Sequence, residues 1–340
     1  MTAPTRQVHP HADTVGVGGL HTDPLWGTVT TLTPLELALL RTWPVRRLGH
    51  VAHAGAVATV TTQTFSRLEH SLGVLGLVAH LDGDDAVTRA AALLHDVGHA
   101  PLSHTLEGIA GIDHHVTGMA RVRALSDLLG EHGVDVDDVV DTLSGARRSA
   151  LRPRLGLVTL DHLDGYVRSA RAHGRRMPAP PRLLRRLTLQ DGVLRTDPAG
   201  ARVLAQLVDA EVAYHRSPLN VLAVGVVRHL VRRWLEPGAD ADAVVGMTDG
   251  ELVAALLRDP RTGDETRHFL TDPLAWCVVP ARPGPAPEGV ELVPGGRSYH
   301  ARALVHGEPL PDHVPVPDRA PDRWVLRRDH PEAGSAVAMP

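Results

Sequence analysis

The sequence is poor in several residue types, and each shortage excludes a class of protein. Its 340 residues include one cysteine, Cys277, which excludes an internal disulfide framework and suits a reducing cytoplasm. Aromatic residues are few, with five Trp, three Tyr and two Phe, and they do not interleave with basic residues as a platform for stacked bases does. No apolar run approaches the ~20 residues that a membrane helix needs, and the N-terminus lacks a signal-peptide pattern. We therefore expect a cytoplasmic protein with no membrane partner.

The charge balance gives no general attraction for nucleic acid. The formal net charge is −4, so an anionic ligand would have to be held by a local cluster of basic groups. Arginines are dense between residues 147 and 186, where they could serve a polyphosphate or a nucleic acid. Most of them are better explained as a solvated helix face. We therefore do not expect a nucleic-acid partner.

The hydrophobic pattern predicts a mainly α protein. A capping box at Thr33 and Glu36 begins one helix. Further helical patterns occupy 66–81, 87–94, 117–130, 136–144, 156–172, 181–188 and 200–235. Beyond about 236, Pro and Gly punctuate short β-like stretches. We predict a flexible tail over 1–19, a helical catalytic domain over 20–235, and a small α+β or β-rich accessory region over 236–340 with a Pro-rich end.

Four side chains in three separate segments form the strongest chemical pattern. His95 and Asp96 are adjacent, His70 lies 25 residues earlier, and Asp161 belongs to a later predicted helix. Two imidazoles and two carboxylates can hold one divalent metal and leave positions open for water and substrate. Mn, Fe, Co, Ni, Zn and Mg all suit this donor set. We therefore predict one divalent metal per chain without assigning its identity.

The segments that carry these residues resemble motifs of the HD-domain phosphohydrolases, most closely the branch containing the deoxynucleoside triphosphate triphosphohydrolases. The resemblance covers roughly 20–230. Its motifs are Arg-Leu-Glu-His-Ser-Leu-Gly at 67–73, Leu-Leu-His-Asp-Val-Gly-His-Ala-Pro-Leu-Ser-His at 93–104, and Leu-Asp-His-Leu-Asp at 160–164. The resemblance implies an HD-domain helical bundle that cleaves a phosphate ester or anhydride of a nucleotide, and it implies a homo-oligomer.

The predicted site combines the roles implied by this resemblance with the chemistry of the residues. The predicted metal ligands are His70, His95, Asp96 and Asp161; the catalytic residues are His99, His104 and His115; the substrate contacts are Arg67, Arg46, His162, Asp164 and Tyr214. His99 follows His95 by four residues, close to the metal but free to transfer a proton. Arg67 offers a planar fork that suits phosphate, although an ion pair with Glu69 or Glu107 would also explain it.

Several positions depart from the pattern of that branch. Arg46 stands where the branch has Gln, Gly165 where it has Tyr, and Ser169 where it has Asp. In the triphosphohydrolases these positions help to recognise the base and the sugar hydroxyl. A nucleoside monophosphate, a modified nucleotide or another phosphate ester therefore becomes a plausible substrate.

His114 and His115 stand where the branch has a catalytic His-Glu pair, and three interpretations stay open. They could replace that pair in proton transfer, or they could be a surface pair. Together with His99 they could also hold a second metal, as in di-iron HD-type oxygenases. A further alternative for the whole chain is a catalytically altered nucleotide-binding or regulatory protein.

Overall fold

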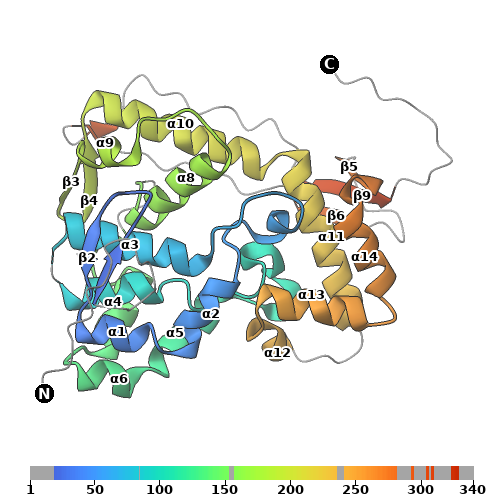
Figure 1. Ribbon diagram of the computed structural model, residues 1–340, viewed down its shortest axis with the longest axis horizontal. Coiled ribbons are helices and arrows are strands. Elements are labelled where there is room, and N and C mark those ends of the chain that lie inside the picture. The colour runs from blue at the N-terminus through green and yellow to red at the C-terminus, as the bar shows by residue number, and fades with distance from the viewer. Residues whose placement is uncertain are drawn as a thin grey trace, which may run out of the picture.

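A computed structural model confirms the mainly helical fold with small sheets (Figure 1). It describes residues 19–83, 85–152, 157–235 and 241–281, together with four strands at 292–294, 304–305, 308–309 and 323–328. The predicted tail and most of the Pro-rich end lie outside these residues. None of the helices in the described ranges is both long and apolar enough to cross a membrane.

The helices follow one another with short connections. They are α1 (Pro34–Leu39), α2 (Trp43–Arg47), α3 (Arg67–Leu81), α4 (Ala86–Leu94), α5 (His114–Arg123), α6 (Ser126–Glu131), α7 (Val136–Ser144), α8 (Leu160–Ala172), α9 (Pro180–Leu184), α10 (Pro198–His215), α11 (Pro218–Leu235), α12 (Ala241–Val245), α13 (Asp249–Arg258) and α14 (Gly263–Thr271). The predicted capping box is present, because Thr33 and Glu36 bond each other's backbone N–H groups. A 3-10 helix occupies Gly55–Thr59, in the segment before α3.

The sheets are small. Strands β1 (Leu20–Thr22) and β2 (Val29–Thr31) form an antiparallel hairpin. In the second sheet, β3 (Leu187–Gln190) pairs with β4 (Val193–Thr196), and β7 (Leu304–Val305) and β8 (Glu308–Pro309) extend it. In the third, β9 (Arg323–Arg328) lies between β5 (Trp276–Pro280) and β6 (Leu292–Pro294). The helix predicted over 181–188 therefore covers α9 and the start of β3.

Helix α3 lies at the centre of the first hydrophobic core. Its apolar residues, including Leu72, Val74, Leu75 and Leu77, are almost completely buried against α4, α8 and the N-terminal elements. Because α3 is enclosed on most sides, its apolar residues do not form a single stripe. The site residues on α3 are thereby held in a fixed orientation relative to α4 and α8.

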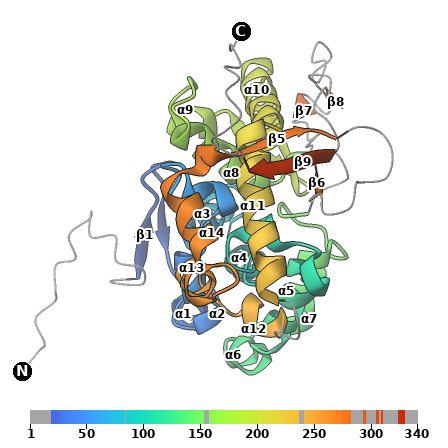
Figure 2. The same cartoon turned by 90° about the vertical axis from the view of Figure 1, so that its right-hand side faces the viewer.

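A second core joins the loop after the His-Asp pair to the C-terminal elements. Leu102, Leu106 and Ile109 pack in the same cluster as residues of α11, α13, α14, β5 and β9. Figures 1 and 2 show α11, α13 and α14 grouped with β5 and β9 on one side of the molecule. The C-terminal elements therefore pack directly behind a loop that contributes site residues.

Candidate metal centre

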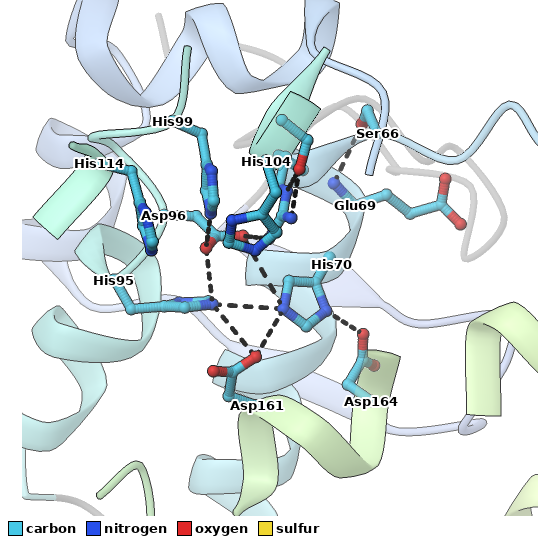
Figure 3. Close-up of polar contacts among 12 residues, drawn as sticks. Ser66, Glu69, His70, His95, Asp96, His99, His104, His114, Asp161 and Asp164 are labelled. Atoms are coloured by element: carbon cyan, nitrogen blue, oxygen red, sulfur yellow. Dashed lines mark hydrogen bonds and ion pairs between the residues drawn. The ribbon is translucent and has the colours of Figure 1, made fainter. Parts of the chain in front are cut away.

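Three elements bring the predicted metal ligands together (Figure 3). His70 projects from α3, His95 is the C-cap of α4, and Asp161 lies in the first turn of α8. The Nε2 atom of His70 lies 3.2 Å from Nε2 of His95 and 3.1 Å from Oδ1 of Asp161, which itself lies 3.8 Å from Nε2 of His95. These three residues offer ligand atoms that all lie within 4.8 Å of one another.

The other ring nitrogen of each histidine is occupied, which fixes the tautomer. Nδ1 of His95 lies 2.8 Å from the Ala92 carbonyl oxygen, which can only accept, so Nδ1 carries the proton. Nδ1 of His70 lies 2.7 Å from Oδ2 of Asp164. Both Nε2 atoms are thereby directed at the same point, as in metal sites where a carboxylate or carbonyl orients the imidazole.

The local charges favour a cation at this point. Burial disfavours a protonated His70, but the hydrogen bonds that its ring donates to Asp161 and Asp164 outweigh it and raise its pKa to about 9. Burial also opposes ionisation of Asp161, yet the hydrogen bond with His70 and the charge of His95 hold its carboxyl pKa well below the ordinary range. A proton thus balances the carboxylates in the place that a divalent cation would occupy.

Asp96 lies between two groups of imidazoles. Its Oδ1 is 3.4 Å from Nε2 of His95 and 3.1 Å from Nε2 of His99, while Oδ2 accepts a hydrogen bond of 2.8 Å from Arg67. Burial opposes its ionisation, but Arg67 and His95 outweigh it and hold the carboxyl pKa well below its usual value. Arg67 therefore forms its ion pair with Asp96 and not with Glu69 or Glu107, the partners considered from the sequence, and its guanidinium also donates to Ser103.

A second group of possible ligands adjoins the first. His99, His104, Glu107 and His114 offer atoms within 4.8 Å of one another. The rings of His99 and His114 stack at 4.4 Å with an interplanar angle of 10°, and Nδ1 of His114 lies 2.6 Å from Oε1 of Glu107. Burial and the charge of Arg67 lower the pKa of His99 well below its usual value, so this imidazole is neutral.

Behind His70, a buried network holds Asp164. Its Oδ1 accepts a 2.7 Å hydrogen bond from the Trp26 indole, and Oδ2 accepts one of 2.7 Å from Arg168. Arg168 also pairs with Asp23 in the turn between β1 and β2. The β1–β2 hairpin therefore supports His70 on α3 through Arg168 and Asp164, which both lie on α8.

Three of the four predicted ligands, His95, Asp96 and Asp161, line a cavity of about 360 Å³, a size suited to a small molecule. It is lined by His53, Ala54, Gln63, Phe65, Arg67, His95, Asp96, His99, His104, Glu107, Asp113, His114, His115, Arg152, Asp161, His162, Gly165, Tyr166, Ser169, Glu211, Tyr214 and His215. Two predicted substrate contacts are not on this wall. Asp164 is completely buried behind His70, and Arg46 is exposed on α2, where its neighbour Arg47 is the buried residue.

Sequence reasoning missed several lining residues. His53 stacks on Phe65 with ring centroids 4.8 Å apart and meets His70 edge-on at 4.6 Å. Gln63 donates to the Tyr214 hydroxyl at 2.9 Å. His53, Gln63 and Phe65 lie in the irregular segment before α3, which contains no recognisable motif. The sequence does contain a signal for Glu107 as a possible metal ligand, because it follows His104 by three residues.

The structure is mainly helical and gathers His and Asp side chains, as possible metal ligands, at a cavity. Residues 67–194 match the family model described as HD domain. Residues 67–194 therefore form an HD domain, so this part of the predicted resemblance is confirmed. Its assignment to the triphosphohydrolase branch stays a prediction.

Two relatives are similar in sequence to parts of this chain. The uncharacterized protein MJ1154 of Methanocaldococcus jannaschii is 26% identical over 244 residues, or 65% of this chain and 51% of that protein. The metal-dependent phosphohydrolase cns2 of Cordyceps militaris is 30% identical over 120 residues, or 33% of this chain and 34% of that protein. The chain therefore spans about half the length of the first relative and about a third of the second.

Two solved structures share the fold. A phosphohydrolase from Bacteroides thetaiotaomicron gives a TM-score of 0.62 at 18% identity, covering 79% of this chain and 80% of that one. A hypothetical protein from Aquifex aeolicus gives a TM-score of 0.59 at 20% identity, covering 74% of each chain. At this identity the likeness establishes the fold alone.

Proposed function

We propose that this protein is a metal-dependent phosphohydrolase that acts on a nucleotide. The observation that carries the proposal is the convergence of the Nε2 atoms of His70 and His95 with Asp161 and Asp96 at the wall of the cavity. The HD domain over 67–194 and the printed name of the relative cns2 support hydrolysis. The single cysteine favours a cytoplasmic site of action, and the resemblance favours a homo-oligomer.

The donor set fits one divalent metal. Its two imidazoles have their Nε2 lone pairs directed inward, and two carboxylates neutralise the charge. When bound, such an ion lowers the pKa of a water molecule and polarises a phosphoryl oxygen. In this proposal His70, His95, Asp96 and Asp161 are the ligands, and Asp164 positions His70 instead of contacting substrate.

The remaining lining residues would handle protons and the substrate. His99 donates from Nε2 to Asp96, and its buried Nδ1 has no hydrogen-bond partner within the described ranges. A neutral imidazole in this state can accept a proton at Nδ1. His104 and His115 line the same part of the cavity as His99, which supports a share in proton transfer. Arg67, His162 and Tyr214 are the proposed substrate contacts among the lining residues.

The decisive experiment pairs metal content with phosphate release. The purified protein is analysed for metals and assayed against nucleoside mono- and triphosphates with Mn, Co and Mg. We expect one metal per chain and metal-dependent release of phosphate or tripolyphosphate. The variant carrying both His95→Ala and Asp96→Ala should lose turnover while its circular dichroism stays unchanged. Undiminished hydrolysis by that folded variant would contradict the proposal.

A second candidate function rests on the second group of ligands. Asp96 lies between the two groups, and His99, His104, Glu107 and His114 could hold another ion beside the first. A centre with two irons would favour a di-iron oxygenase over a hydrolase. Two iron atoms per chain, together with no release of phosphate from any nucleotide, would favour this alternative, whereas one metal per chain would exclude it.

A further inference from the structure

The cavity contains two guanidinium groups of very different environment. Among the lining residues these belong to Arg67 and Arg152. Arg67 is buried and paired with Asp96 at 2.8 Å, so its charge is already balanced by a predicted metal ligand. Arg152 forms no ion pair with any carboxylate in the described part of the chain. Among the described residues, no carboxylate therefore neutralises the positive charge of Arg152.

The backbone and the Nε atom of Arg152 are held by hydrogen bonds, whereas its terminal nitrogens can bind a ligand. The residue lies between α7 and α8, where its backbone forms an isolated antiparallel bridge with Ser149. Its Nε donates to the Leu143 carbonyl oxygen at 3.0 Å. This bond leaves the two terminal nitrogens of the fork, which are the atoms that bind phosphate oxygens in pairs. The side chain is exposed to solvent at the cavity wall.

Arg152 lines the same cavity as His99, His114 and His115. His99 bonds Asp96 at 3.1 Å and stacks on His114 at 4.4 Å, and the His114 ring lies 3.9 Å from that of His115. After burial and the effect of His114, the charge of Arg152 is the next influence that lowers the pKa of His115. Arg152 therefore acts on His115, whose ring is separated from Asp96 by the rings of His99 and His114.

We propose that Arg152 binds an anionic group of the substrate that is separate from the phosphorus attacked at the metal centre. This inference rests on the proposed phosphohydrolase function. A single phosphate held beside Asp96 would lie next to His99, whereas Arg152 acts on His115, two imidazoles further along this series of contacts. A second phosphate, as in a di- or triphosphate, would place oxygens near the fork. The position of Arg152 thus favours substrates with two or more phosphate groups over monoesters.

Binding of pyrophosphate tests this role without any turnover. The protein as purified, Arg152→Gln and Arg148→Gln are titrated with pyrophosphate by calorimetry at one fixed salt concentration. Arg148 is the matched control, because it is an exposed arginine in the same loop that does not line the cavity. We expect Arg152→Gln to bind pyrophosphate about tenfold more weakly, as befits the loss of charge-assisted hydrogen bonds. Arg148→Gln should bind as the unaltered protein does.

Three other results of the titration would count against the proposal. Equal affinity of Arg152→Gln and the unaltered protein would overturn it, as would no measurable binding of pyrophosphate by either. An equal loss in both variants would mean a general charge effect and no site. A protein that binds pyrophosphate through Arg152 but hydrolyses no nucleotide would keep this inference and refute the proposed function. For an active protein, Arg152→Gln should raise KM for a nucleoside triphosphate while kcat and the KM for a monophosphate stay unchanged.

Discussion

The Nδ1 atom of His70 lies 2.7 Å from Oδ2 of Asp164, and both side chains are completely shielded from solvent. His70 belongs to α3 and Asp164 to α8, and 94 positions separate the two residues in the sequence. A carboxylate on Nδ1 keeps the proton there and presents Nε2 as the ligand atom. Metal binding should therefore depend on a residue that never reaches the cavity.

The first prediction concerns Asp164→Asn. The amide has nearly the same shape, but it is uncharged and can present N–H to the ring, so the tautomer of His70 is no longer enforced. We expect metal affinity to fall by about 10- to 100-fold, the range typical of residues that orient metal-binding histidines. Calorimetric titration with Mn measures this change. Asp138→Asn, at an exposed position on α7, should leave the affinity unaltered.

The second prediction concerns the close approach of α3 to α8. A Cβ atom at Gly73 would lie 2.2 Å from Oδ1 of Asp164 and 2.3 Å from Nη2 of Arg168. Gly73→Ala should therefore lower the free energy of unfolding by about 1–3 kcal/mol, as overpacking does, and weaken metal binding as well. Gly130→Ala on α6 meets nothing within 4 Å and should raise stability by about 0.5–1 kcal/mol. Denaturant unfolding distinguishes the two; equal stabilities would refute the proposed crowding.

The third prediction concerns Asp249, which supports an uncommon backbone conformation. Its Oδ1 accepts from the Leu102 N–H at 2.6 Å and Oδ2 from the Ala52 N–H at 2.7 Å. Leu102 and Ser103 both have positive φ, at 54° and 59°, which costs non-glycine residues roughly 1–2 kcal/mol each. Asp249→Ala should release this turn, displace Ser103 from Arg67 and speed amide hydrogen exchange over 100–106.

The control for this variant is Asp264→Ala, an exposed carboxylate on α14. It should exchange as the unaltered protein does. Unchanged protection of Leu102 in Asp249→Ala would show that the turn is held by its own packing and not by the carboxylate.

The fourth prediction is a pH dependence of stability. Burial opposes ionisation of Glu211, but His215, Ser169 and Arg175 outweigh it and lower the pKa of Glu211 below its ordinary value of 4.5. A carboxyl whose pKa is lowered on folding stabilises the protein above its unfolded pKa, and this contribution is lost as pH falls through the folded pKa. Glu211→Gln should therefore cost about 1–3 kcal/mol at pH 7, with the difference from the unaltered protein shrinking below pH 4.5. Urea unfolding at several pH values measures it, and a constant difference would contradict it.

Much of the helical framework could be predicted because it follows the hydrophobic pattern. Helices α3, α4 and α7 begin and end close to the predicted positions, and Thr33 caps α1 as expected. The hairpin of β3 and β4 was missed, although Asp191-Gly192 between them is a common two-residue turn. Both residues have positive φ, as that turn requires. The apolar residues over 181–188 have helical spacing, and this pattern favoured a helix over the first strand of the hairpin.

The orientation of site residues was harder to predict. Asp161 and Asp164 are three positions apart, so they share one face of α8 in any helical prediction. Which of them faces the cavity depends on the rotation of α8 against α3, and that rotation is set by packing. Trp26 contributes to it through its bond with Asp164, from a turn 138 positions away. No local pattern carries such long-range information.

The bond between Asp249 and Leu102 also sets an order of events during synthesis. All four predicted metal ligands and their support on α8 have been synthesised once the chain has reached residue 168. The carboxylate that holds Leu102 comes 147 positions after it and therefore emerges last. Because domains form progressively from the N-terminus, a nascent chain can assemble the cation site before its histidine-lined loop has been fixed. Metal uptake and completion of the substrate cavity are then separate stages in the life of one molecule.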